Sequence, residues 1–318
     1  MTSKYPLPSL FHRLASQQNQ NVKHFIALRE KKQYRLDQGS VMIQGFKTVQ
    51  EVRDQGIQFK SMVVTAKKDL NTEADIQSPA LQVIKQPELF PAQHYYVTDI
   101  NLARRILGTA SKPGNHDIFG EAIIPRFRNE AQIFSRDRIL VFDRISDPGN
   151  LGTLVRTAKA LGWQSGLITH HSCDLYNDKC IRASRGTSLT WPHLTVNANQ
   201  VLNQLRDEGY TPIVADMLPK KSPNVEMWSP ENQSNAVPGT GVWFWNQPRS
   251  LLPSIKKMAL ILSSEHHGVN DAFANELRVS LPMDPSVESL NVANAGSILM
   301  SDLNRLTLPK QVHDMGYK

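Results

Sequence analysis

Short apolar runs alternate with amphipathic helical patterns through the second half of the chain. The runs predict strands at 138–143, 166–169, 211–215, 259–262 and 278–281. Apolar residues at helical spacing predict helices at 151–161, 177–184 and 200–208, and another that begins at Val292. Strands that alternate with helices in this way predict a parallel sheet with helices on both faces.

The first third of the chain predicts a smaller α/β domain. Its patterns indicate helices at 22–35, 46–52 and 99–107, and strands at 41–43, 61–65 and 81–84. A turn-rich stretch at 111–116 and a polar stretch at 127–138 follow. We therefore expect one domain at 1–110, a linker at 111–137 and a second domain at 138–318. Prolines, asparagines and glycines predict an irregular insertion near 218–246, whose aromatic end packs back onto the second domain.

Positive charge is concentrated near the N-terminus. The formal net charge is +7, and residues 1–60 hold ten Lys or Arg against four acidic residues. This excess indicates a polyanionic partner, with nucleic acid favoured over a membrane because no amphipathic anchor accompanies it. A solvated basic face is the alternative. The candidate RNA contacts are basic residues of the first predicted helix: Lys23, Arg29, Lys31, Lys32 and Arg35.

Composition narrows the class of protein further. No apolar run approaches membrane-spanning length, and we expect no membrane partner. The two cysteines, Cys173 and Cys180, cannot form a disulfide framework and are expected to be reduced thiols. No secretory signal pattern is present, but residues 1–29 lack acidic residues, as organelle presequences do. The expected location is therefore the cytoplasm, or a mitochondrion or plastid.

Two predicted helices begin with polar residues that suit a ligand site. Asn150 stands beside two glycines at one helix entrance, and glycines allow a ligand to approach the backbone closely. Arg156 lies about 140° around that helix from the apolar Leu151, at ~100° per residue, so it points outward. Ser289 and Asn291 occupy the entrance of the last helix. A capped helix without a ligand is the simpler interpretation of either motif alone.

The stretch ILSSEHHGVN at 261–270 ends a predicted strand in small hydroxyl residues, a carboxylate and a glycine. This pattern is typical of a ligand loop at the carboxyl edge of a parallel sheet. The adjacent His266 and His267 point in different directions and have no further ligand set beside them, so we expect no metal.

Taken in order, these three stretches resemble the signature motifs of SpoU-type (TrmH-like) RNA 2′-O-ribose methyltransferases of the SPOUT superfamily. The motifs are the Asn–Gly–Arg helix start, the strand with an acidic loop, and the PM…ESLN stretch before a small-residue helix. The resemblance covers about 139–305, and IRASRG at 181–186 also matches. The basic front domain resembles the small ribosomal-protein-like substrate-binding domain of rRNA-modifying members.

The resemblance implies a trefoil-knotted, parallel-sheet methyltransferase domain, a homodimer and S-adenosylmethionine as cofactor. It implies catalytic roles for Arg156, supplied by the neighbouring subunit, and for Asn150, Ser289, Asn291 and Glu265. The implied cofactor-binding residues are Ser263, Gly268, Leu281, Met283, Leu290 and Asn291. The expected substrate is structured RNA, with rRNA favoured over tRNA.

The chain departs from the family pattern at Ser263 and His266, where glycine is usual or frequent, and at Gln44, which replaces an acidic residue. Bulk on the cofactor loops keeps one alternative open, a non-catalytic RNA-binding or ribosome-assembly protein of the same fold. A tRNA 2′-O-methyltransferase is another alternative. A nucleotide-dependent α/β enzyme of a different class is disfavoured because the chain has no GxGxxG or Walker-type loop.

Overall fold

The chain forms two compact units, of which the first comprises residues 1–126 and 174–190 and the second 127–173 and 191–318. The computed structural model describes residues 7–67, 75–108, 113–125, 130–217, 242–245, 255–264, 267–284 and 286–307. None of the helices within these ranges is both long and apolar enough to cross a membrane.

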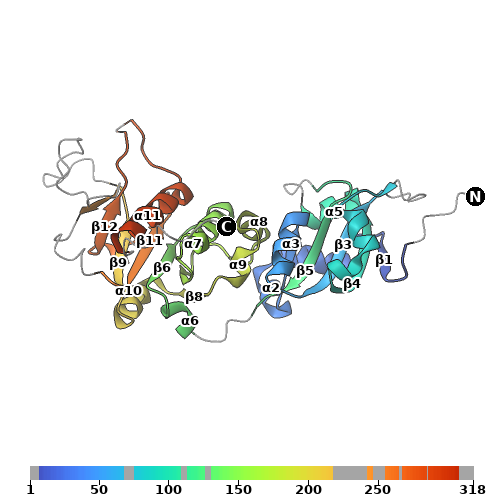
Figure 1. The fold of residues 1–318 in the computed structure, drawn as a ribbon, viewed down its shortest axis with the longest axis horizontal. Helices are drawn as coiled ribbons and strands as arrows, with labels where there is room; N and C mark the ends of the chain where they lie inside the picture. The colour runs from blue at the N-terminus through green and yellow to red at the C-terminus, as the bar shows by residue number, and fades with distance from the viewer. Residues whose placement is uncertain are drawn as a thin grey trace, which may run out of the picture. The chain divides into compact units, whose positions relative to one another are not determined.

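The first unit is built on a five-stranded mixed sheet (Figure 1). The strand order is β1-β4-β3-β5-β2, in which β1, β4 and β3 are parallel and β5 is antiparallel to β3 and β2. The strands are β1 Phe11–Leu14, β2 Ser40–Gln44, β3 Phe59–Ala66, β4 Ala92–Asp99 and β5 Ile118–Ile123. The helices are α1 Gln20–Glu30, α2 Lys32–Gln38, α3 Phe46–Asp54, α4 Ala80–Lys85, η2 Pro87–Leu89, α5 Ile100–Leu107, α8 Asp178–Ser184 and α9 Thr187–Thr190.

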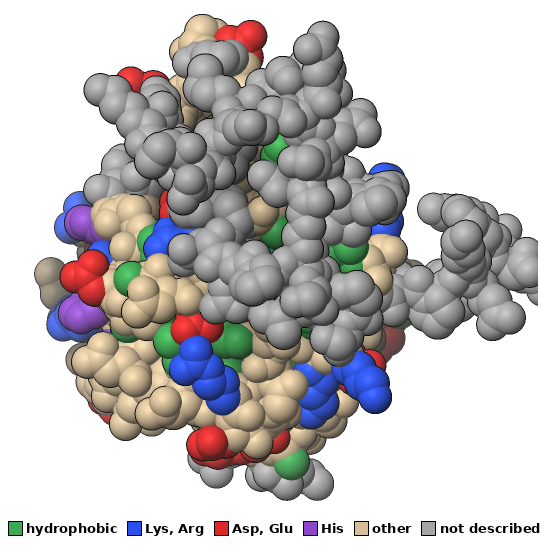
Figure 2. All heavy atoms as spheres, turned by 90° about the vertical axis from the view of Figure 1, so that its left-hand side faces the viewer, with side chains coloured by type: hydrophobic (Ala, Val, Ile, Leu, Met, Phe, Trp, Pro, Cys, Tyr) green, Lys and Arg blue, Asp and Glu red, His purple; other side chains and the backbone are tan. Residues whose placement is uncertain are grey.

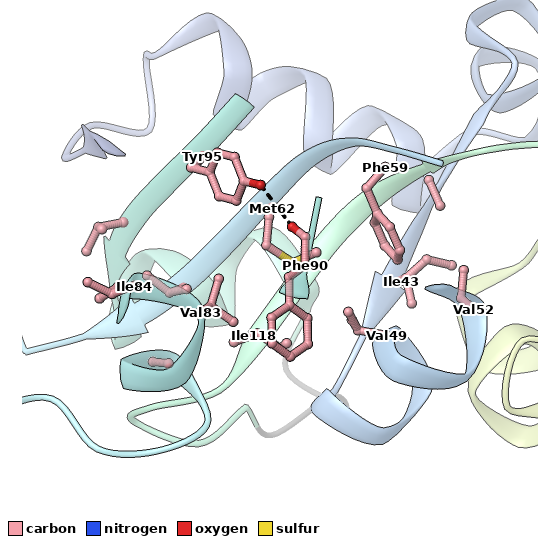
Figure 3. Packing of buried hydrophobic residues seen from close by; sticks show 14 of the residues in the cluster. Ile43, Val49, Val52, Phe59, Met62, Val83, Ile84, Phe90, Tyr95 and Ile118 are labelled. Atoms are coloured by element: carbon pink, nitrogen blue, oxygen red, sulfur yellow. Dashed lines mark hydrogen bonds between the residues drawn. The ribbon is translucent and has the colours of Figure 1, made fainter. Parts of the chain in front are cut away.

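Side chains of β3 alternate between two hydrophobic clusters, one on each face of this sheet. Val63 packs with residues of α1 and α5, whereas Met62 and Val64 pack with residues of α3 and α4. Figure 3 shows the second cluster, where the Tyr95 hydroxyl donates to the carbonyl oxygen of Phe90 at 3.0 Å. The same hydroxyl also accepts from the Ala92 N–H at 2.9 Å, so this buried polar group is satisfied.

The first unit also contains a segment from the middle of the chain. Residues 174–190 follow strand β7 (Gly166–Thr169) of the second unit in sequence, but Ile181 and Leu189 are fully buried in the first unit's core. Arg185 pairs with Glu51 at 3.1 Å. The predicted helix at 177–184 is therefore confirmed as α8, but it packs with the front unit, a long-range contact that periodicity cannot reveal.

Two sequence predictions for the front unit were wrong. The predicted strand at 81–84 is helix α4, because a four-residue apolar run fits a buried helix turn as well as a strand. The predicted linker at 111–137 contains β5, which pairs with two strands. Gly120 made this strand hard to recognise, because glycine weakens the pattern of a strand. A Cβ at this position would lie 2.7 Å from the backbone oxygen of Ser61, so only glycine fits. Strands β1 and β4 were not predicted.

The second unit is built on a seven-stranded sheet of order β10-β12-β9-β11-β6-β7-β8. All adjacent strands are parallel except β10, which lies antiparallel to β12 at the edge. The strands are β6 Arg138–Asp143, β7 Gly166–Thr169, β8 His193–Val196, β9 Thr211–Ala215, β10 Trp243–Trp245, β11 Met258–Ser263 and β12 Leu277–Ser280. The helices are α6 Ala131–Phe134, α7 Pro148–Ala160, α10 Ala198–Asp207, η6 Asp271–Phe273 and α11 Val292–Thr307. The predicted parallel sheet is confirmed.

Strand β10 confirms that aromatic residues near the end of the predicted insertion pack onto the second unit. Residues 218–241 of that insertion lie outside the described residues. Strand β8 was not predicted, because its four residues are only partly buried or exposed and carry no apolar run.

Helix α11 packs closely against α7 and β11. A Cβ at Gly296 would lie 2.6 Å from Cδ2 of Leu154 and 2.9 Å from Cδ1 of Leu262, so glycine permits this approach. Further along α11, Asn304 accepts from Nε1 of Trp163 at 3.1 Å and donates to the Leu161 carbonyl at 2.8 Å. These contacts hold α11 alongside α7 from the middle of both helices to their C-terminal ends.

Burial raises the pKa of two tyrosines, and this makes the stability of the protein depend on pH in the alkaline range. It raises the pKa of Tyr210 to about 12, with help from Glu208 and Asp137, and the pKa of Tyr176 to about 12, with help from Asp174. The unfolded chain loses these protons near the ordinary pKa of 10.0, while the folded chain keeps them. We therefore expect the free energy of unfolding to fall as pH rises from about 10 towards 12. Urea unfolding across this range measures the fall, and a flat profile in the wild type would contradict it.

Candidate active site at the carboxyl ends of β9, β11 and β12

A cavity of about 130 Å³ lies where the neighbouring parallel strands β9, β11 and β12 end. The loops that follow these strands and the first turns of α11 line it. This is the edge at which parallel α/β sheets bind ligands. Hydrophobic side chains such as Leu262, Val279 and Leu299 form much of the wall.

Most of the predicted cofactor-binding residues line this cavity. They are Ser263, Gly268, Leu281, Met283 and Leu290. Asn291, the sixth, is not among the lining residues, but it immediately follows Leu290 and takes part in the bond described below. The sequence motifs therefore identified loops that the fold brings together from β11, β12 and the start of α11.

Ser263 is the polar residue most directly suited to a ligand. Its Oγ is buried and has no hydrogen-bond partner among the described residues. A buried hydroxyl without a partner costs free energy, so a ligand group that bonds to it would be stabilised. Gly268, on the same loop, has a φ of +61°, a conformation that glycine adopts without strain.

Sequence reasoning missed the contribution of β9. Ala215, Asp216 and Met217 line the cavity at the end of this strand. Asp216 forms an ion pair with Arg278 of β12, and its carbonyl oxygen accepts from the Ser280 hydroxyl. The sequence feature that could have identified this part of the site is Asp216, an acidic residue directly after a buried strand.

Two predicted catalytic residues, 141 positions apart in sequence, are hydrogen-bonded. Nδ2 of Asn291 donates to Oδ1 of Asn150 at 3.0 Å. Oδ1 of Asn291 accepts from the backbone N–H of Ala293 at 3.0 Å and so caps α11, while Asp147 caps α7 by accepting from the N–H of Asn150 at 2.7 Å. Each helix start is therefore fixed, and the two amides join them.

Of the other predicted catalytic residues, one lines the cavity, one lies away from it and one is outside the described residues. Ser289 is exposed and lines the cavity. Arg156 is exposed on α7, does not line the cavity, and makes no hydrogen bond or ion pair with any residue that the structure describes. Glu265, together with the neighbouring His266, lies outside the described residues.

The predicted RNA-binding residues of the front unit fall into two groups. Lys23, Lys31 and Lys32 are exposed, as an RNA contact requires. Arg35 is only 3% exposed; it donates to two backbone carbonyls and forms an ion pair with Asp174. Its predicted RNA contact is therefore wrong, because the guanidinium is buried and both of its terminal nitrogens bond within the unit.

Arg29 is also engaged, since its guanidinium donates to the carbonyl oxygens of Arg105 at 3.0 Å and Ile106 at 2.6 Å. These carbonyls belong to the last turn of α5, where a cation is stabilising. This observation gives Arg29 a structural role.

Charge on the second unit is mixed on the face shown in Figure 2. Positive and negative side chains are interspersed over the described part of that face, with hydrophobic atoms between them. No set of three or more His, Cys, Asp or Glu side chains that could hold a metal ion occurs among the described residues.

Comparison with known proteins places this geometry in a family. The SpoU rRNA Methylase family matches residues 137–301, and an MRM3-like substrate binding domain matches residues 19–90. The chain belongs to the SpoU rRNA methylase family, which confirms the resemblance found in the sequence. The substrate-binding match lies within the first unit, and the methylase match covers most of the second unit together with residues 174–190 of the first.

Curated relatives and solved structures agree with this assignment. The chain is 25% identical over 293 residues, 91% of its length and 98% of the relative's, to 23S rRNA (guanosine(2553)-2′-O)-methyltransferase RlmP of Bacillus subtilis. A Danio rerio protein, rRNA methyltransferase 3A, mitochondrial, is 24% identical over 73% of this chain and 58% of its own. The fold matches AviRb of Streptomyces viridochromogenes, solved with AdoMet, at a TM-score of 0.67 and 18% identity over 91% of this chain and 98% of that one.

Proposed function

We propose that this chain methylates a ribose 2′-hydroxyl of RNA with S-adenosylmethionine as methyl donor, and that the RNA is ribosomal. The observation that carries the proposal is the juxtaposition at the start of α11. There the Asn150–Asn291 bond joins the first and third signature motifs beside a cavity lined by the second and third.

The cavity fits S-adenosylmethionine in its chemistry. Its apolar walls, including Leu262 and Leu299, suit a planar adenine ring, and the unpartnered Oγ of Ser263 offers a hydrogen bond to a polar group of the cofactor. When bound, S-adenosylmethionine supplies an activated methyl group on a sulfonium. The protein must then align and activate the ribose hydroxyl, which is the poorer reaction partner.

Different side chains align the ribose hydroxyl and activate it. Asn150 and Asn291 hold each other and orient the ribose, and Ser289 contributes a hydroxyl at the mouth of the cavity. Arg156 stabilises the developing alkoxide electrostatically, because a guanidinium loses its proton too reluctantly to serve as an ordinary base. Glu265 shapes the loop after β11.

The proposal includes a homodimer with a trefoil-knotted second unit, as the family resemblance implies. Arg156 is exposed and is not part of its own chain's cavity lining. Donation of this side chain to the cavity of a second copy accounts for its exposure and its lack of a described partner. A twofold arrangement does this reciprocally, so each dimer holds two sites.

The basic front unit, which resembles a small ribosomal-protein-like domain, would hold the RNA by its phosphates. Lys23, Lys31 and Lys32 are the exposed cations proposed for this contact. The names of the bacterial and mitochondrial relatives favour rRNA as the substrate and leave cytoplasm and organelle both open as locations.

The Ser263 hydroxyl gives a direct test of the cofactor site. Ser263→Ala is expected to weaken S-adenosylmethionine about three- to tenfold, the effect of losing one hydrogen bond. Calorimetric titration measures this, with Ser135→Ala, an exposed serine outside the cavity, as the matched control. Equal affinities in all three proteins would remove Ser263 from the site.

A non-catalytic RNA-binding protein of the same fold is the second candidate, favoured by a serine where the family usually has glycine. Absence of any S-adenosylmethionine binding in wild type would support that candidate against the enzyme. Mapping ribose methylation across rRNA from cells with and without this protein tests the substrate, and one lost modification is the expected result.

A further inference from the structure

A second, larger cavity of about 450 Å³ lies at the carboxyl ends of β6, β7 and β8. The loop after β11 borders both cavities, because Gly268 lines the cofactor cavity and Asn270 lines this one. The walls are polar and include Thr169, His170 and Gln200. None of the motifs that carry the proposed reaction accounts for this cavity.

Strand register places three groups side by side at its base. These are Asp143 at the end of β6, Thr169 at the end of β7 and Asn197 directly after β8. Phe142 pairs with Ile168 and Thr169 pairs with Val196, so the three residues lie on adjacent strands at one edge of the sheet. With interstrand spacings of about 4.8 Å, Asp143 and Asn197 lie roughly 10 Å apart across the cavity. A single nucleotide can span this distance.

Asp143 marks one end of the cavity. It is fully buried and lines the cavity; Oδ2 accepts from Nε of Arg144 at 3.0 Å, whereas Oδ1 has no hydrogen-bond partner among the described residues. Leaving a buried carboxylate oxygen without a donor is costly, and Arg144 offsets the charge but does not bond to Oδ1. The site therefore lacks one N–H or O–H donor.

Helix α10 marks the other end. Its N-cap Asn197 makes no side-chain capping bond, its first turn contains no acidic residue, and Asn199 lies in that turn and lines the cavity. The backbone N–H groups and the dipole of a helix start attract an anion such as a phosphate. The exposed His170 and His171 stand at the same cavity.

We propose that this cavity binds a nucleotide of the RNA next to the methylated one, with a base N–H donated to Oδ1 of Asp143 and a phosphate at the start of α10. Guanine meets this requirement, because its Watson–Crick edge carries N–H donors, of which one can reach Oδ1. The inference rests on the proposed function and identifies a specificity site for it.

The position of the cavity supports this role. Asp143 ends β6, and the short β6–α7 connection leads from it to Asn150 in the first turn of α7, so the cavity adjoins the segment proposed to orient the target ribose. Two backbone N–H groups fasten the connection to the loop after β7: Ile145 donates to the Ser172 hydroxyl at 3.2 Å, and Cys173 donates to the Ile145 carbonyl at 2.8 Å.

The test is calorimetric titration of the full chain with guanosine 5′-monophosphate and with inorganic phosphate, while S-adenosylhomocysteine saturates the cofactor cavity. Asn199→Asp places a negative charge at the second residue of α10, where it favours the helix but repels a phosphate. We expect it to weaken the nucleotide about tenfold or more. Asn101→Asp, the same exposed change at the second residue of α5, is the matched control and should leave the affinity unchanged.

Asp143→Asn tests the base contact. The amide keeps its oxygen towards Arg144 and turns its NH₂ towards the cavity, so a donor replaces the acceptor. We expect about tenfold weaker nucleotide binding with unchanged phosphate binding. If this variant does not fold by circular dichroism, Asn199→Asp carries the test.

Three results would overturn the proposal. The first is no nucleotide binding by the wild type, and the second is an equal effect of Asn199→Asp and Asn101→Asp on nucleotide affinity. The third is that phosphate and nucleotide bind with equal affinity and that Asp143→Asn changes neither affinity. The last result would indicate an anion site only. Affinity for S-adenosylmethionine and methyl transfer to RNA are measured on the same proteins. Failure of the proposed function would therefore appear in those assays, separately from the nucleotide titration.

Discussion

Replacing Arg156 with alanine is expected to lower methyl transfer to RNA about a hundred- to a thousandfold, the usual effect of removing one preorganised donor from a developing oxyanion. Affinity for S-adenosylmethionine should stay unchanged, because Arg156 does not line its own chain's cavity. Arg156→Lys should recover only part of the rate, since an ammonium keeps the charge but loses the planar fork of donors. Lys159→Ala, an exposed cation on the same helix, is the matched control.

Mixed dimers extend this prediction to the partner copy. Arg156→Ala leaves the cavity intact, whereas Ser263→Trp fills the cavity and leaves Arg156 intact. Each heterodimer would contain one complete site, so random mixing of the two inactive variants should restore about a quarter of the wild-type sites. No recovery after subunit exchange would contradict donation of Arg156 across a dimer.

Arg35→Ala is expected to destabilise the front unit by about 3–5 kcal/mol, because it removes the buried partner of an ion pair and leaves the mostly buried Asp174 carboxylate unpaired. The variant also removes two hydrogen bonds to backbone carbonyls. Chemical unfolding of the full chain, followed by circular dichroism, measures the loss. Lys31→Ala is the matched control, since an exposed cation on the same part of the chain should change stability by less than about 0.5 kcal/mol.

The two variants should differ in RNA binding as well. Lys31→Ala is expected to weaken RNA and reduce the salt dependence of binding, as loss of a phosphate contact does. A fully stable Arg35→Ala protein that binds RNA poorly would show that Arg35 contacts RNA after all, and would contradict its structural role.

More strands of the second unit than of the front unit could be predicted from the sequence, and the reason is physical. Parallel strands buried on both faces form continuous apolar runs, so β6, β9 and β11 were recognisable. In the front unit, β5 carries Gly120 and the buried Glu121, which interrupt such a run. Glu121 is accommodated by hydrogen bonds that only the folded sheet provides, including one from the Ser40 hydroxyl at 2.6 Å.

The same distinction applies to the candidate site. Ser263, Met283 and Leu290 lie in the motifs that resemble the family's, and the structure brings them to one cavity. The burial of Arg35 depends on Asp174, which is 139 residues away, so a basic helical pattern could not distinguish it from an exposed cation. The cavity-lining residues at the end of β9 were not predicted, because the only local indication was one acidic residue after the strand.

The chemical identity of the product tests the central claim most directly. The full chain would be incubated with rRNA and S-adenosylmethionine labelled in the methyl group, and the RNA would then be hydrolysed with alkali. A ribose 2′-O-methyl group blocks cleavage at its own nucleotide, so the label should appear in alkali-resistant dinucleotides. Label in mononucleotides would indicate methylation of a base, and either that result or the absence of label would contradict the proposed function.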